Sequence, residues 1–71
     1  MKFSLINVFR ESRGFVDGTW LQDCNGVTLE EATERARATE KANSNRIKVA
    51  VVEQLIYVPN YSNKTGLKRL D

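Results

Sequence analysis

Residues 15–26 read FVDGTWLQDCNG, and this stretch decides how the chain folds because it holds two turn dipeptides. Asp17-Gly18 lies between two apolar, β-prone pairs, and Asp-Gly tolerates the positive φ that a type I′ turn requires at both central residues. A turn there places Phe15 opposite Trp20, a favourable cross-strand pair worth ~0.2–1 kcal/mol relative to two alanines. We therefore predict a β-hairpin that turns at Asp17-Gly18.

The residues on either side of this turn have the composition of strands. Residues 3–10, FSLINVFR, alternate in character and are rich in β-branched and aromatic side chains, which predicts a strand. Ile6 and Val8 share one face, and the opposite face carries Phe3, Leu5 and Phe9. Apolar side chains on both faces indicate a central strand. We expect the second strand over residues 19–24 and an irregularity near residues 12–14.

A helix follows the second turn dipeptide, Asn25-Gly26. Thr28 and Glu31 have the spacing of a capping box, in which each side chain satisfies a backbone N–H that the start of the helix leaves unpaired. The helix is predicted from Leu29 to Ala42. Its end falls in a short polar stretch whose asparagines suit a left-handed cap: Asn43, Ser44 and Asn45. Its inner stripe is mostly alanine and threonine, so it approaches a sheet closely but buries little apolar area.

Residues 46–58, RIKVAVVEQLIYV, form the strongest strand pattern in the chain. The side chains on one face are Ile47, Val49 and Val51, and those on the other are Ala50, Val52, Ile56 and Val58. Pro59 ends the pattern. The remainder, residues 59–71, is polar and basic, and it is either a loose arm or a short closing turn.

These elements predict an α+β domain with the order β-β-α-β. The two-sided apolarity of residues 3–10 places that strand in the middle of a three-stranded, mainly antiparallel sheet with the order 2-1-3. One helix packs on one face of this sheet. We assign residues 1–58 to the single domain and residues 59–71 to a polar, basic C-terminal tail.

A single helix leaves the second face of such a sheet uncovered. An exposed apolar patch of a few hundred Å² usually marks an interaction surface, so we expect a homodimer or another protein on this face. The expected contact residues are Trp20, Ile6, Val8, Val52, Ile56 and Tyr57. Trp20 has two interpretations, a core residue beside Phe15 or an exposed anchor for a partner.

The chain lacks the residue types on which most catalytic and metal sites depend. It has no histidine and one cysteine, so a Cys/His nucleophile pair, an internal disulfide and a Cys/His zinc site are all excluded within one chain. Asp17, Asp23 and Asn25 do not have the spacing of a calcium loop. We therefore expect no enzyme activity, no metal and no cofactor, and we interpret Cys24 as an ordinary small apolar residue.

The charge distribution leaves one alternative partner. The formal net charge is only +2, but the tail combines cations with stacking rings, which suits single-stranded nucleic acid. The residues of this alternative are Tyr61, Lys64, Lys68 and Arg69. The sequence has no signal peptide and no apolar run of transmembrane length, so we expect a cytoplasmic protein with no membrane contact. A short chain of this kind is typical of small proteins from bacteria, phages and mobile elements.

Overall fold

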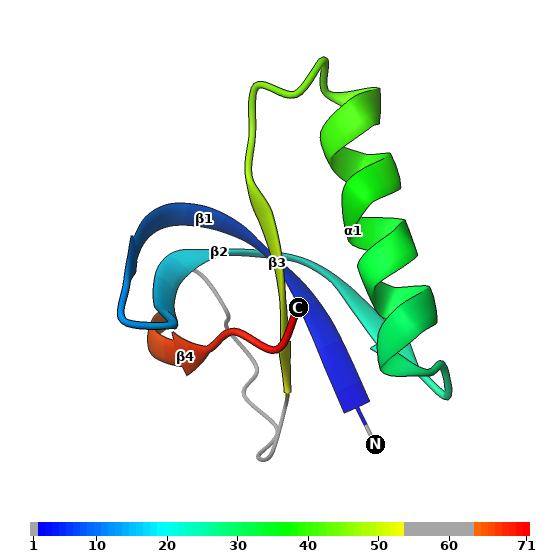
Figure 1. Ribbon diagram of the computed structural model, residues 1–71, viewed down its shortest axis with the longest axis horizontal. Helices are drawn as coiled ribbons and strands as arrows, with labels where there is room; N and C mark the ends of the chain where they lie inside the picture. The colour runs from blue at the N-terminus through cyan, green and yellow to red at the C-terminus, as the bar shows by residue number, and fades with distance from the viewer. Residues whose placement is uncertain (1, 54–63) are drawn as a thin grey trace.

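The computed structural model describes residues 2–53 and 64–71. The element order is β1 (Lys2–Ser12), β2 (Phe15–Asn25), α1 (Leu29–Ala42), β3 (Val49–Glu53) and β4 (Lys64–Lys68). The strands form one antiparallel sheet with the order β3-β1-β2-β4 (Figure 1). The predicted α+β class, the single helix on the sheet and the 2-1-3 order of the first three strands are confirmed. The fourth strand, β4, lies beside β2 and falls in the segment that the sequence pattern assigns to the tail.

The hairpin turns four residues earlier than the sequence indicates. Arg13 and Gly14 occupy the turn with φ values of 54° and 81°, the two positive values of a type I′ turn, whereas Asp17 and Gly18 lie inside β2. The predicted pairing of Phe15 with Trp20 is therefore wrong. The physical reason is the length of the ladder, because a turn at Arg13-Gly14 lets β1 pair with β2 from residue 2 to residue 12. This gain outweighs the ~1–2 kcal/mol that a left-handed Arg13 costs.

Gly18 serves close packing between strands. A Cβ atom built on Gly18 would lie 2.2 Å from the backbone oxygen of Asn7 and 2.5 Å from Cγ2 of Ile6. The register shifts beside it, between Val8 and Arg10, so that Phe9 is an extra residue in β1. Such bulges increase the local bend and twist, and Figure 1 shows β1 and β2 arching together away from α1.

Phe9, the extra residue of the bulge, differs in exposure from the residues predicted to share its face. The sequence pattern places Phe9 on the same face as Phe3 and Leu5, but its side chain is 61% exposed while those two are buried. An extra residue in one strand changes the side to which the following side chains point.

The helix agrees with its sequence signals. Thr28 is the N-cap, and its hydroxyl accepts a hydrogen bond from the backbone N–H of Glu31 at 3.1 Å. Asn43 is the C-cap, and Ser44 and Asn45 follow it with left-handed φ values of 58° and 56°. Only two residues of the predicted inner stripe, Ala32 and Ala36, are buried.

The core has two parts, one on each face of the sheet. The helix-side cluster lies between α1 and the sheet and consists of Phe3, Leu5, Cys24, Ala32, Ala36, Val49 and Val51. The opposite cluster consists of Ile6, Val16, Ala50 and Val52, with Val8 and Leu67 packed against it. The alternation predicted for β3 is thus confirmed over Val49–Glu53, and residues 54–58 of that predicted strand lie outside the described residues.

The sheet curls so that the chain leaving one edge strand, β4, reaches the other edge strand, β3. Arg69, which directly follows β4, forms a bridge with Val52 of β3, and the backbone N–H of Leu70 donates to the oxygen of Val51 at 2.8 Å. Figure 1 shows the C-terminus lying against β3. Leu67 of β4 packs on the opposite cluster, so β4 contributes to the burial of apolar residues on the face that α1 does not cover.

Candidate functional site

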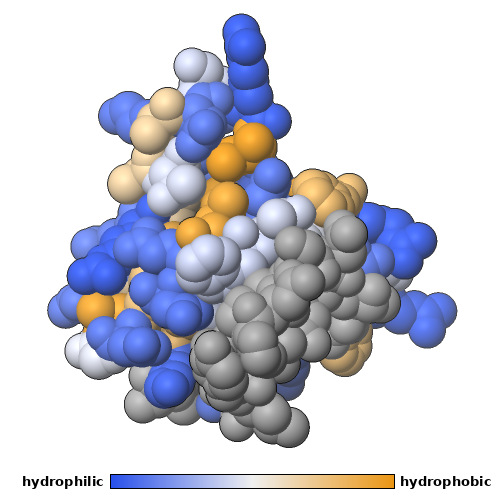
Figure 2. All heavy atoms as spheres, turned by 180° about the vertical axis from the view of Figure 1, so that it is seen from behind, coloured by the Kyte–Doolittle hydropathy of each residue, from blue (hydrophilic) through white to orange (hydrophobic). Residues whose placement is uncertain are grey.

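The structure buries most of the described side chains of the predicted apolar contact face. Ile6 is 0% and Val52 2% exposed, both within the opposite cluster, and Val8 is partly buried against them. Ile56 and Tyr57 lie outside the described residues. Hydrophilic side chains cover most of the described surface in the rear view, with apolar atoms in small areas between them (Figure 2). Ile6 and Val52 are therefore not available as contact residues on the surface of the single chain.

Trp20 lies on β2 with its side chain 39% exposed. Its Nε1–H donates to Oδ1 of Asp23 at 3.0 Å, and the buried Ser4 hydroxyl donates to the same oxygen at 2.9 Å. Asp23 thus holds the indole ring in place. Of the two interpretations of Trp20, the structure favours the one in which part of the ring meets solvent.

The end of the β1–β2 hairpin presents a second aromatic surface, which we call the hairpin face. Phe15 is 50% exposed, and its neighbour across the β2–β4 ladder is Lys68, an exposed residue. Arg10 and Asp17 pair in the β1–β2 ladder, with Nη2 of Arg10 2.7 Å from Oδ2 of Asp17. Residues two apart on a strand share a face. The hairpin face therefore comprises Arg10, Phe15, Asp17 and Lys68.

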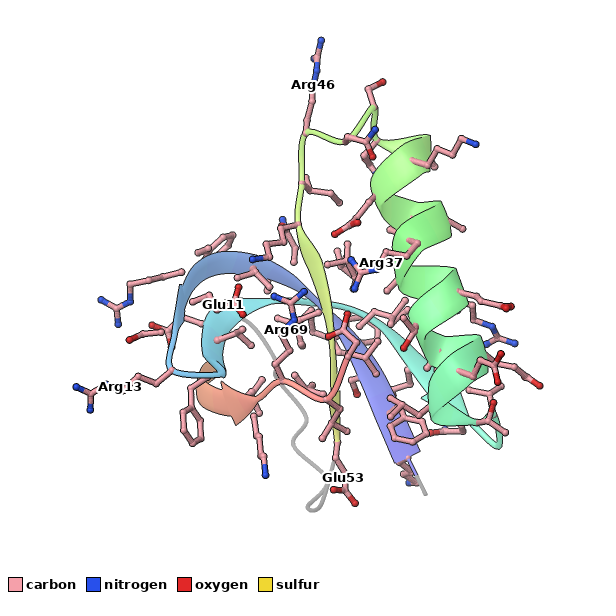
Figure 3. All side chains as sticks on the ribbon, viewed as in Figure 1. Glu11, Arg13, Arg37, Arg46, Glu53 and Arg69 are labelled. Atoms are coloured by element: carbon pink, nitrogen blue, oxygen red, sulfur yellow. The ribbon has the colours of Figure 1, made fainter. Side chains whose placement is uncertain are left out.

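Two further exposed residues border the hairpin face. Arg13 occupies the turn, and its side chain points away from the molecule (Figure 3). Phe9 lies in the bulge next to Arg10 and is 61% exposed. Together, Arg10, Arg13 and Lys68 supply three cations against the one carboxylate of Asp17, so this end of the sheet is an aromatic surface with a positive excess.

A cluster of charged side chains joins the C-terminal residues to the rest of the fold, and we call it the C-terminal clasp. Arg69 Nη1 lies 2.7 Å from Oε2 of Glu11, which also pairs with Lys48. Arg69 Nε lies 3.0 Å from Oδ1 of Asp71, and Asp71 pairs with Arg37 of α1. Figure 3 shows Arg69 between Glu11 and Arg37. The clasp therefore ties β1, α1 and the C-terminal residues together.

Two carboxylates of this region are held in their charged form. Hydrogen bonds from Lys48 and then Arg69 lower the pKa of Glu11. Burial raises the pKa of Glu40, but a hydrogen bond from the backbone N–H of Val49 and the Arg37 guanidinium outweigh that effect, so its pKa is lowered overall. These groups stabilise the fold by charge pairing and are not poised to exchange protons near neutral pH.

The outer edge of β3 is closed by the same region. The N–H of Val49 donates to Oε2 of Glu40 at 2.7 Å, and its oxygen accepts from Arg37 at 3.2 Å. The N–H of Val51 donates to Oδ1 of Asp71 at 3.2 Å, and its oxygen accepts from Leu70. An added strand needs unpaired backbone groups on the edge it joins. Strand addition at Val49 and Val51 therefore requires displacement of these partners.

The remaining predicted residues are placed as follows. Lys64 is in β4 with Gly18 as its ladder partner, Lys68 is exposed, and Arg69 is engaged in the clasp with its side chain 17% exposed. Tyr61 lies outside the described residues. Cys24 is a free, fully buried thiol in the helix-side cluster, and in the described part of the chain no three His, Cys, Asp or Glu side chains come together as metal ligands.

Sequence reasoning did not identify the hairpin face or the clasp. Exposure of Phe9 and Phe15 depends on the bulge and on the position of the turn. The members of the clasp are far apart in sequence, with Glu11 and Arg69 separated by 58 positions, and single charges carry no spacing signal. The described part of the chain also contains no helix with the length and apolar character that a membrane crossing requires.

Comparisons with protein-family models, with curated proteins and with solved structures found no match. The fold and the site therefore define the class of this protein by themselves. It is a small α+β protein with a curled antiparallel sheet, one helix and a hairpin end that presents exposed phenylalanines among cations.

Proposed function

We propose that this chain is a non-catalytic binding protein whose main contact surface is the hairpin face and whose partner is another protein. The observation that carries the proposal is the half-exposed Phe15 on a strand that is paired on both sides, by β1 and by β4. An aromatic ring on a paired strand loses little conformational freedom when it binds. Aromatic and arginine side chains are the residues that most often dominate protein interfaces.

The charges near Phe15 define the chemistry of the expected partner. This surface carries three positive charges, from Arg10, Arg13 and Lys68, and one negative charge, from Asp17. A partner segment with an apolar residue flanked by carboxylates therefore fits it. Charge complementarity of this kind mainly raises the association rate and selects among partners. Trp20 remains a second contact, since part of its indole ring is exposed.

Cytoplasmic location belongs to the same proposal. Its support is the single free cysteine, because small domains of oxidising compartments usually depend on disulfides. Dimerisation through the opposite cluster has lost its support, since Ile6 and Val52 are buried within one chain.

The test compares Phe15→Ala with a control, Leu29→Ala, which alters another exposed apolar residue, 39% exposed on α1. Partners captured from a lysate by the full chain are identified, purified and titrated directly against each variant. We expect Phe15→Ala to raise the dissociation constant at least about tenfold, the effect of ~1.4 kcal/mol, and Leu29→Ala to leave it unchanged. Equal effects of the two substitutions would contradict the assignment of the surface.

A second candidate partner is single-stranded nucleic acid. The observation in its favour is that the β2–β4 ladder places Lys68 beside Phe15, which combines a cation with a ring on which a base can stack. A labelled oligonucleotide decides between the two partners. Phosphate contacts are strongest at low salt, so absence of binding at low salt removes nucleic acid from consideration.

A further inference from the structure

The last eight residues lie along the rest of the fold, and we call them the arm (residues 64–71). Its strand, β4, pairs with β2, and Leu67 packs on the opposite cluster. Leu70 packs on the helix-side cluster. The arm thus crosses from one core to the other and contributes one leucine to each.

The end of the arm is bound by polar contacts with three different elements. Arg69 pairs with Glu11 of β1, and Asp71 pairs with Arg37 of α1. Asp71 and Leu70 bond the backbone of Val51 in β3. The Asp71 side chain is only 1% exposed. Apart from the Arg69–Asp71 pair, each of these contacts joins the arm to a group in residues 2–53.

The body of the fold therefore contains a site that the arm fills with two leucines, a cation and a carboxylate. Without the arm, the edge of β3 would expose the N–H and oxygen of Val51, and Glu11 would lose one of its two cations. Leaving such groups unpaired is costly. A second copy of the chain carries the same arm with the same leucines, cation and carboxylate.

We propose that this site also accepts the arm of a second copy, so that two chains form a dimer by reciprocal exchange of residues 64–71. Every contact between the arm and residues 2–53 is then remade between chains, which makes exchange a low-cost route to a dimer. The dimer competes with the closed monomer, in which the arm has an effective concentration in the millimolar range. Lys68 of the hairpin face would come from the partner chain, so exchange preserves that face.

The test uses two full-length variants with opposite defects. Glu11→Arg breaks the site and Arg69→Glu breaks the arm, so each variant alone opposes like charges across the clasp. In an equimolar mixture, the intact arm of one chain meets the intact site of the other, and the two altered residues meet as Arg and Glu. We expect a heterodimer of twice the chain mass by native mass spectrometry with one chain isotope-labelled, and little dimer in either variant alone.

Arg10→Glu and Asp17→Arg form the matched control, since they reverse an ion pair of 2.7 Å that lies wholly within the hairpin. Mixing these two variants restores no contact between chains and should give monomers. Should either clasp variant be unfolded alone, recovery of its circular dichroism on mixing supports exchange. Folded monomers in the clasp mixture, no recovery of an unfolded variant, or equal dimer in the control overturns it. These outcomes do not depend on capture of a partner by Phe15.

Discussion

At the scale of single residues, Gly18 and Arg13 have roles that differ from those their neighbouring residues predict. Asp17-Gly18 has the composition of a turn, yet Gly18 is buried within β2 and faces the backbone of Asn7. Arg13 is a poor residue for a left-handed conformation and nevertheless occupies one. In both cases, the packing of whole strands outweighs a local preference, which for the left-handed Arg13 is ~1–2 kcal/mol.

We predict that Gly18→Ala destabilises the protein strongly. The new Cβ would lie 2.2 Å from a backbone oxygen that cannot move without disturbing β1, and overpacking of this kind typically costs ~1–3 kcal/mol or more. Urea unfolding measures the loss. Gly14→Ala is the control, because nothing lies within 4 Å of its Cβ and only the φ of 81° is strained, at ~1–2 kcal/mol. A smaller loss for Gly18→Ala than for Gly14→Ala would show that the close approach to Asn7 is incorrect.

At the scale of elements, the β1–β2 hairpin is the least predictable part of the fold and α1 the most predictable. The helix start and end depend on residues within four positions of each other, Thr28 with Glu31 and Asn43 with Thr39. The hairpin depends on which of two dipeptides turns, and local preference favours Asp17-Gly18 because Arg13 is a poor residue for a left-handed conformation. The sheet decides between them, because only a turn at Arg13-Gly14 pairs the full length of both strands.

We predict that Arg13→Asn stabilises the hairpin. Asn adopts left-handed φ more readily than Arg, and Asn-Gly is a preferred type I′ dipeptide. The expected gain in the free energy of unfolding is ~0.5–1 kcal/mol, measured by chemical denaturation. Asp17→Asn offers the comparison, since it would create Asn-Gly at the other dipeptide. A gain from Asp17→Asn and none from Arg13→Asn would place the turn at residues 17 and 18.

At the scale of the whole molecule, the sequence pattern predicts an uncovered apolar face on the sheet. In the structure the sheet curls, and the residues predicted for that face, Ile6 and Val52, are buried. Both lie in the opposite cluster, against which Leu67 of β4 packs, and Arg69 bridges Val52. The clasp holds this closure, with the Asp71 carboxylate reaching Val51, Arg69 and Arg37. Closure also covers the edge of β3, which limits uncontrolled strand addition.

We predict that Glu11 of the clasp and Glu40, which bonds Val49 beside it, make stability fall in acid. The pKa values of Glu11 and Glu40 are lowered from 4.5 in the folded protein. Their contribution is therefore fully present above pH 4.5 and is lost as the pH falls through the folded values. Glu40→Gln should lower the free energy of unfolding at pH 7 by ~1 kcal/mol and flatten its decline below pH 4.5.

Thermal unfolding between pH 7 and pH 3 measures this prediction. Glu34→Gln is the matched control, because it removes the same charge from an exposed position on α1 that has no described contact with the clasp. An equally steep decline in Glu40→Gln and in the unaltered chain would mean that Glu40 does not contribute to the acid response.

The sequence by itself determined the class of the protein, the helix with its caps, and the alternation of β3, since each follows from residues a few positions apart. The lack of histidine and the single cysteine likewise exclude a Cys/His nucleophile pair and a Cys/His zinc site on composition alone. Only the tertiary structure decided where the hairpin turns, which face of β1 each residue occupies after the bulge, and that Arg69 and Asp71 close the sheet. These depend on contacts between residues up to 58 positions apart, whose energies appear only when strands, helix and arm come together.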